Sequence, residues 1–327
     1  MLVPLWVLLL SPLGPLEALA QETVPRDVVI ASIPGVIDAD ATWHLAWQGT
    51  NNADGIVGLP DGSVLFAQEQ PRLVGRLDER DGYSVYVEGT RGVGSLSIDA
   101  QGRLLGVERS CTDPGRRAST PCTEPTAISV LTPTRRVLTD TFDGASLGRL
   151  NDLVTDSRGG VYFTVGNAFH VDDRGQVTRL DDDLQANGIM LSPDERTLYV
   201  TNRRQIVAFD VAADGTTANR REFAVLEAGG VGDGMTVDER GRLYVTSNPG
   251  VQVFADDGTY LGLIPTPRPA ISATFAGPRK RRLYVVGSGA ALGPDGSEFT
   301  TPEGVRNNAK TIYRIDMLAA GYAGRAK

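Results

Sequence analysis

The chain has 327 residues, which at about 150 residues per domain suggests two domains, although all-β folds of this length often form one. Apolar residues make up 41% and charged residues 22%, values that exclude disordered and fibrous classes, and 38 glycines with 19 prolines favour a fold with many turns. The formal charge of -8 argues against a nucleic-acid groove, because such a groove needs a basic face to replace counterions.

The N-terminus has the pattern of a processing signal. Residues 2–16 are apolar but interrupted by three prolines, and this stretch is too short to span a bilayer comfortably. The sequence Ala18-Leu19-Ala20 then provides the small-x-small pattern of a signal-peptidase site. We therefore expect a signal peptide at 1–20, a single domain at 21–327 with no membrane span, and a secreted or periplasmic protein. The missing positive charge near the start keeps an uncleaved anchor as the alternative.

The two cysteines lie in one insert. Cys111 and Cys122 are separated by a stretch rich in proline, threonine and arginine. In an oxidising compartment, a lone pair of cysteines is most simply a disulfide that closes the loop. A thiol nucleophile or a metal site is the alternative, but the chain has no CxxC motif and only two histidines.

One phrase recurs six times along the chain: apolar residues, an Asp-containing turn, then an apolar strand. It ends at Phe66, Leu105, Phe163, Tyr199, Tyr244 and Tyr284, at steps of 36 to 45 residues except for the one that contains both cysteines. Each phrase predicts a hairpin, and further short strands fill the gaps. About four strands per forty residues is typical of a propeller blade, so the sequence predicts an all-β, six-bladed β-propeller with four-stranded blades around a central channel. Such a ring must close, and we expect a strand near residues 27–31 to complete the last blade.

Polar oxygen-bearing residues recur just before the apolar part of several phrases. These are Asp54, Asn151, Asn187 and Asp233. Carboxylate and amide oxygens converging from four blades suit a hard divalent cation, most simply Ca²⁺. The alternative is that Asn-Gly and Asp-Gly pairs only make turns.

The segments Leu150-Asn-Asp-Leu-Val, Ala186-Asn-Gly-Ile-Met and Gly232-Asp-Gly-Met-Thr resemble successive blades of the gluconolactonase/regucalcin (senescence marker protein) family. That family is related to diisopropylfluorophosphatase and, more remotely, to paraoxonase. The resemblance covers roughly residues 54–317 and implies a six-bladed propeller that binds a divalent metal and hydrolyses lactones or esters.

By motif, the resemblance carries the metal ligands onto Asp54, Asn151, Asn187 and Asp233. The first position departs from the family pattern, because Asp replaces the usual Glu and is one methylene shorter. Asn151 would also contact substrate. Ser95 and Ser272 stand where relatives often keep Asn, so we expect substrate contacts there, and His170 could line the pocket mouth.

For the chemistry we expect a metal-bound small lactone or ester, with Asp233 as the general base or as the direct nucleophile. The chain lacks a GxSxG elbow, an HExxH motif and a Walker A loop. The prediction is a calcium-dependent lactonase or esterase that acts on a sugar-type lactone. The alternative is a propeller that binds a ligand or partner without chemistry, since a fold does not fix a function.

Overall fold

The computed structural model describes residues 25–49, 51–109, 124–289, 311–324 and 327. The predicted signal peptide and both cysteines lie outside the described residues. In the described part, no helix has the length and apolar character needed to cross a membrane. A short 3₁₀ helix, η2 (Pro278–Lys280), and a small hairpin of β10 (Thr141–Phe142) and β11 (Ala145–Ser146) accompany the main sheets.

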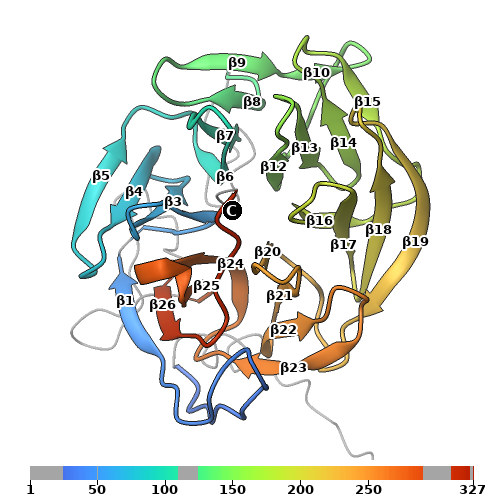
Figure 1. Ribbon diagram of the computed structural model, residues 1–327. Coiled ribbons are helices and arrows are strands. Elements are labelled where there is room, and N and C mark those ends of the chain that lie inside the picture. The colour runs from blue at the N-terminus through green and yellow to red at the C-terminus, as the bar shows by residue number, and fades with distance from the viewer. Residues whose placement is uncertain (1–24, 50, 110–123, 290–310, 325–326) are drawn as a thin grey trace, which may run out of the picture.

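Six four-stranded antiparallel sheets surround a central axis (Figure 1), which confirms the predicted propeller. Blade 1 contains β2 (Ile56–Gly58), β3 (Val64–Gln68), β4 (Leu73–Leu77) and β5 (Tyr83–Val87). Blade 2 contains β6 (Val93–Ile98), β7 (Leu104–Glu108), β8 (Ala127–Val130) and β9 (Arg136–Thr139). Blade 3 contains β12 (Leu153–Thr155), β13 (Val161–Thr164), β14 (Ala168–Val171) and β15 (Val177–Arg179).

The remaining three blades follow in chain order. Blade 4 contains β16 (Ala186–Leu191), β17 (Thr197–Asn202), β18 (Gln205–Val211) and β19 (Thr217–Val225). Blade 5 contains β20 (Met235–Val237), β21 (Leu243–Ser247), β22 (Gly250–Phe254) and β23 (Tyr260–Pro265). Blade 6 contains β24 (Ala270–Ala276), β25 (Arg282–Gly287), β26 (Thr311–Asp316) and β1 (His44–Gln48).

The recurring phrase corresponds to the two inner strands of each blade. All six closing residues of the phrase lie in the second strand, and each faces a residue of the innermost strand across an antiparallel ladder. Phe66 and Tyr284, for example, are both buried and belong to one apolar cluster shared by blades 1 and 6. The repeat therefore reflects a packing position that recurs in each blade, at which a large side chain packs against the neighbouring blade.

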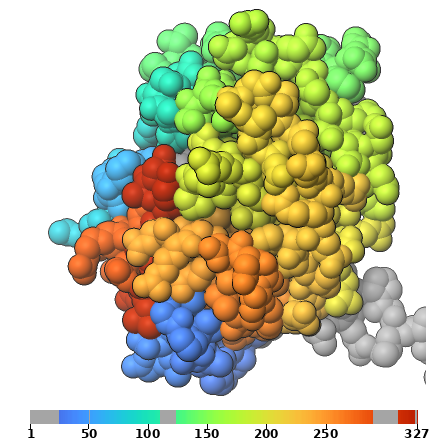
Figure 2. All heavy atoms as spheres, turned by 45° about the vertical axis from the view of Figure 1, so that its right-hand side comes forward, coloured from blue at the N-terminus to red at the C-terminus, as the bar shows by residue number. Residues whose placement is uncertain are grey.

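The apolar core lies between blades. Each of five buried clusters draws its side chains from at least two adjacent blades. Aromatic rings make several of these contacts, such as Tyr244 against Phe275 with ring centroids 4.9 Å apart. Neighbouring blades are thus packed side by side, and in Figure 2 the yellow atoms of blade 4 adjoin the orange atoms of blade 5.

An N-terminal strand closes the ring, but it is not the one expected. β1 pairs with β26 as the outermost strand of blade 6, whereas residues 27–31 form no strand. The expectation for 27–31 was wrong: of these residues only Ile30 is buried, and Val29 is 87% exposed. Ile30 and Ile33 are buried in the cluster that joins blades 5 and 6, in irregular backbone.

Candidate active site

The four polar residues singled out in the sequence lie at one end of the channel, where the innermost strands begin. They are Asp54, two residues before β2; Asn151, two before β12; Asn187, the second residue of β16; and Asp233, two before β20. In the first, second and fourth, the backbone N–H donates to a carbonyl oxygen near the end of the adjacent second strand, at 2.8 to 2.9 Å. These three therefore occupy equivalent positions in blades 1, 3 and 5.

Three of these residues are followed by a glycine, and close packing of the neighbouring backbone explains why. A Cβ on Gly188 would lie 2.0 Å from the carbonyl oxygen of Asp233, and a Cβ on Gly55 would lie 2.5 Å from the Cα of Ser95. Neither glycine has a positive φ, and neither lies in a hairpin turn. Each Asp-Gly or Asn-Gly pair here puts an oxygen at the channel end and lets the next innermost strand approach.

A buried arginine links three of the four polar residues. The Arg109 guanidinium donates to Asp54 Oδ2 at 2.5 Å and to Asn151 Oδ1 at 3.2 Å. The Asn151 amide in turn donates to Asn187 Oδ1 at 2.6 Å. Residues from blades 1 to 4 thus form one hydrogen-bonded chain around the channel end.

Arg109 also forms a second, fully buried ion pair. Its Nε and Nη2 donate to the two carboxylate oxygens of Glu69, at 2.7 and 3.2 Å, and Nη1 donates to the Leu150 carbonyl oxygen at 3.0 Å. The side chains of Arg109 and Glu69 are 2% and 4% exposed. Burial alone would lower the pKa of Arg109, but the Asp54 and Glu69 carboxylates raise it above its usual value. The guanidinium is therefore a permanent cation at the site.

Asp233 and Ser272 lie on the next two blades around the ring. Asp233 is half-buried, and its carbonyl oxygen is in contact with the backbone of blade 4 at Gly188. Ser272 is half-buried in β24 and lies beside Gly234, which donates its N–H to the carbonyl oxygen of Ile271 at 2.9 Å. Both residues are therefore at the channel.

Ser95 is buried more deeply than Asp233 and Ser272. It is 4% exposed, and its hydroxyl donates to Asp152 Oδ1 at 2.6 Å, so it supports the layer beneath Asn151. The structure does not bring His170 to the cluster. His170 lies on the third strand of blade 3, with its ring against Tyr162 and its Nε2 3.4 Å from Asp156 Oδ2.

His170 instead belongs to an ion-pair cluster at the other end of blade 3. Asp156 directly follows β12, whereas Asn151 precedes it. Burial would raise the pKa of Asp156, but the His170 ring, Arg158 and two backbone N–H groups lower it to about 2. His170 thus partners a carboxylate that stays ionised.

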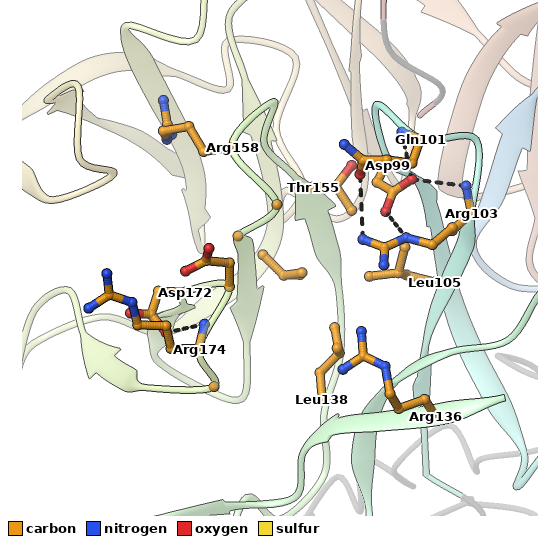
Figure 3. Close-up of a pocket in the computed structure, with 15 residues that line it drawn as sticks. Asp99, Gln101, Arg103, Leu105, Arg136, Leu138, Thr155, Arg158, Asp172 and Arg174 are labelled. Carbon is orange, nitrogen blue, oxygen red and sulfur yellow. Dashed lines mark hydrogen bonds and ion pairs between the residues drawn. The ribbon is translucent and has the colours of Figure 1, made fainter. Parts of the chain in front are cut away.

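A pocket of about 350 Å³ lies at that same end, between blades 2 and 3 (Figure 3). Its lining is charged and includes Asp99, Arg103 and Asp172, with Arg103 paired to Asp99 at 2.6 Å. Thr155, the last residue of β12, is also part of the lining. None of the four polar residues at the strand starts lines this pocket, so it is separate from the candidate active site.

The cluster offers an oxygen donor set of the kind that Ca²⁺ prefers. Asn151 and Asn187 have adjacent amide oxygens, and Asp233 has a carboxylate at the position equivalent to Asn151 two blades on. An amide oxygen has two lone pairs, so one hydrogen bond leaves it able to ligate. Asp54 is the exception because it is already paired with Arg109. Among the described residues, no group of three or more His, Cys, Asp or Glu side chains is arranged to hold a metal. A metal here would therefore depend on the two amides.

Three carboxylates at and beneath the channel end are in ion pairs: Asp54 and Glu69 with Arg109, and Asp152 with Lys327.

The sequence did not predict four residues of this site, namely Arg109, Glu69, Asp152 and Lys327. Arg109 and Glu69 directly follow the second strands of neighbouring blades, and opposite charges at that repeated position were a usable signal. Asp152 stands where Gly55, Gly188 and Gly234 stand in other blades, a departure also visible in the sequence. Nothing in the sequence indicates that Lys327 reaches the channel.

The family model described as the SMP-30/Gluconolactonase/LRE-like region matches residues 60–289. The chain belongs to this family. The match covers blade 1 except for its innermost strand β2, blades 2 to 5, and the first half of blade 6, including three of the four polar positions and Arg109.

Two curated relatives illustrate the similarity. A gluconolactonase of Zymomonas mobilis is 27% identical over 192 residues, which cover 49% of this chain and 54% of that protein. A pentonolactonase of Haloferax volcanii is 30% identical over 188 residues, covering 53% of this chain and 64% of that protein. The matched part thus spans between half and two thirds of either relative.

Solved structures agree on the fold. A gluconolactonase from Xanthomonas campestris superposes with a TM-score of 0.69 at 24% identity, covering 94% of this chain and 99% of that one. A calcium-binding regucalcin from Agrobacterium tumefaciens superposes with a TM-score of 0.64 at 16% identity, covering 86% and 95%. At these identities the likeness establishes the propeller of this family and no more.

Proposed function

We propose that the protein is a lactone hydrolase that depends on a divalent metal, most simply Ca²⁺, and acts on a small sugar-type lactone at the strand-start end of the channel. The observation that carries the proposal is the equivalence of Asp54, Asn151 and Asp233 in alternate blades, with Asn187 hydrogen-bonded to Asn151 between them. The names of the two curated relatives, a gluconolactonase and a pentonolactonase, support the substrate class. The N-terminal pattern supports export to the periplasm or outside the cell.

In this proposal Asn151, Asn187 and Asp233 hold the cation. A bound Ca²⁺ would act as a Lewis acid on the lactone carbonyl. Asp54 has a different role, because its carboxylate binds Arg109, and the Arg109 guanidinium donates to Asn151 Oδ1 and fixes the direction of that amide. The shorter Asp side chain at this position is thus matched by a guanidinium that reaches it.

Asp233 is the proposed general base. Calcium acidifies water weakly compared with zinc, so a carboxylate has to take the proton from the attacking water. Asp233 is half-buried at the channel, opposite the Arg109 side of the ring, and Ser272 lies on the adjoining blade. If the Asp233 carboxylate were instead the direct nucleophile, its attack on the lactone carbonyl would break the ring C–O bond, free the ring oxygen as a hydroxyl and leave an acyl anhydride on Asp233. Hydroxylamine trapping with mass spectrometry would detect the acylated Asp233.

Replacing Asn187 by alanine tests the metal site. Loss of one amide oxygen should weaken Ca²⁺ binding at least about tenfold, because it removes a ligand from a small set. Isothermal titration calorimetry measures this without substrate, and excess Ca²⁺ should restore most of the lactone hydrolysis. The exposed Gln176→Ala is the matched control. Unchanged Ca²⁺ affinity in Asn187→Ala would remove Asn187 from the ligand set.

A further inference from the structure

A lysine side chain lies inside the channel, beneath the candidate active site. Lys327 is 8% exposed, and Figure 1 places this end of the chain at the centre of the ring. Its ammonium donates to Asp152 Oδ2 at 2.5 Å and to the carbonyl oxygen of Ile189 at 2.7 Å. Its own carbonyl oxygen accepts a hydrogen bond from the Thr236 hydroxyl at 2.9 Å. One residue thus contacts the innermost strands of blades 3, 4 and 5.

The Asp152 carboxylate extends this contact to a fourth blade. Its Oδ1 accepts hydrogen bonds from the Ser95 hydroxyl at 2.6 Å and from its neighbour's backbone N–H, and its Oδ2 accepts from the Ile189 N–H at 3.0 Å. The Asp152 side chain is 10% exposed. A carboxylate held by this many donors is fixed in direction, and the ammonium balances its charge.

The contacts of Lys327 lie directly below the four polar residues at the channel end. Asp152 follows Asn151, Ile189 is two residues beyond Asn187, and Thr236 is three beyond Asp233. The tail approaches from the opposite end of the channel, where the Tyr322 N–H donates to the carbonyl oxygen of Val237 and Gly321 forms a bridge with Asp238.

We propose that Lys327 is a positioning residue for lactone hydrolysis. Its ammonium ties the start of β12 to β16 and holds the residue so that its carbonyl oxygen binds Thr236 of β20, and these contacts together set the spacing of Asn151, Asn187 and Asp233. β12 and β20 contain only three residues each, so contacts across the channel contribute much of what fixes their separation. A misplacement of about 1 Å at a reacting centre can cost about a hundredfold in rate. The catalytic consequence rests on the proposed function, whereas the tie between strands does not.

Lys280→Ala provides the matched control. Lys280 holds the same tail from outside the channel, donating to the Tyr322 carbonyl oxygen at 3.1 Å. If Lys327 served only to anchor the tail, Lys280→Ala and Lys327→Ala would behave alike. If Lys327 positions the strands, only Lys327→Ala should affect β12, β16 and β20.

The experiment compares both variants with the parent by steady-state kinetics on its best lactone and by hydrogen–deuterium exchange. For Lys327→Ala we expect kcat to fall at least about tenfold with KM changed less than about twofold, and faster exchange in residues 151–155, 186–191 and 233–237. Propylammonium, which replaces the missing side chain, should restore part of kcat in Lys327→Ala but not in the double variant that also carries Asp152→Asn. Lys280→Ala should show faster exchange only near residues 317–324.

Two results would overturn the proposal: a kcat within about twofold of the parent for Lys327→Ala, or exchange that rises only in the tail. If the parent hydrolyses no lactone, the proposed function fails, and the exchange measurement alone decides whether Lys327 ties the three strands. Faster exchange in all three would then support the tie, and unchanged exchange would refute it.

Discussion

Replacing Asp233 by alanine should lower kcat for any lactone substrate by at least about a hundredfold, while the protein remains folded. General-base help alone contributes about 10² to 10⁴ in rate, and the change also removes a charged ligand from the proposed metal site. Asp233 is half-buried and lies before β20, outside the apolar clusters between the blades, so its loss should leave the fold intact. Initial rates and circular dichroism together measure both expectations.

Two further variants separate the roles of Asp233. Asp233→Asn keeps an oxygen ligand but removes the base, so it should retain more Ca²⁺ affinity than Asp233→Ala and yet remain slow. Asp256→Ala, which removes an exposed carboxylate in the same blade, should hydrolyse the substrate at the parent rate. If Asp233→Ala is as fast as the parent, the enzyme interpretation fails, and the binding-propeller alternative takes its place.

Replacing Arg109 by methionine should lower the free energy of unfolding by about 3–5 kcal/mol, the usual cost of leaving a buried charge without its partner. Methionine fills much of the same volume but removes the Arg109 guanidinium that pairs with the Glu69 carboxylate, which is 4% exposed. Urea denaturation at neutral pH measures the loss. The loss should shrink as the pH falls and Glu69 takes up a proton, because the uncompensated charge then disappears.

The exposed pair of Arg76 and Asp61 in blade 1 is the control for Arg109. Its side chains are 36% and 53% exposed, so Arg76→Met should cost no more than about 1 kcal/mol. Equal losses for Arg76→Met and Arg109→Met would show that the buried pair is not a special feature of the site. Adding Glu69→Gln to Arg109→Met should recover part of the stability.

The repeated phrase was sufficient to predict the ring because its period is set by local chemistry. A turn residue followed by a buried aromatic or leucine gives the same hairpin each time, and Phe66, Tyr244 and Tyr284 take equivalent places without reference to the rest of the chain. The oxygen-bearing residues could be predicted for the same reason, since their phase within the phrase is also local.

Contacts that depend on several blades could not be predicted in this way. Arg109 meets Glu69 and Asp54 across separations of 40 and 55 residues, and Lys327 meets Asp152 across 175. Such pairs form only once different blades pack against one another. The closing strand shows the same limit: residues 27–31 have strand-like composition, but only Ile30 is buried, against blades 5 and 6, and β1 takes the closing position instead.

The most direct test of the proposed function is lactone hydrolysis by the metal-depleted parent protein. Purified protein is treated with a chelator, dialysed, and assayed by proton release on glucono- and pentonolactones and on aryl esters while Ca²⁺ is added back. The expected result is hydrolysis of at least one lactone that disappears with the metal and returns in proportion to Ca²⁺ up to one ion per chain. A protein that binds no divalent metal and hydrolyses none of these substrates at any Ca²⁺ concentration would contradict it.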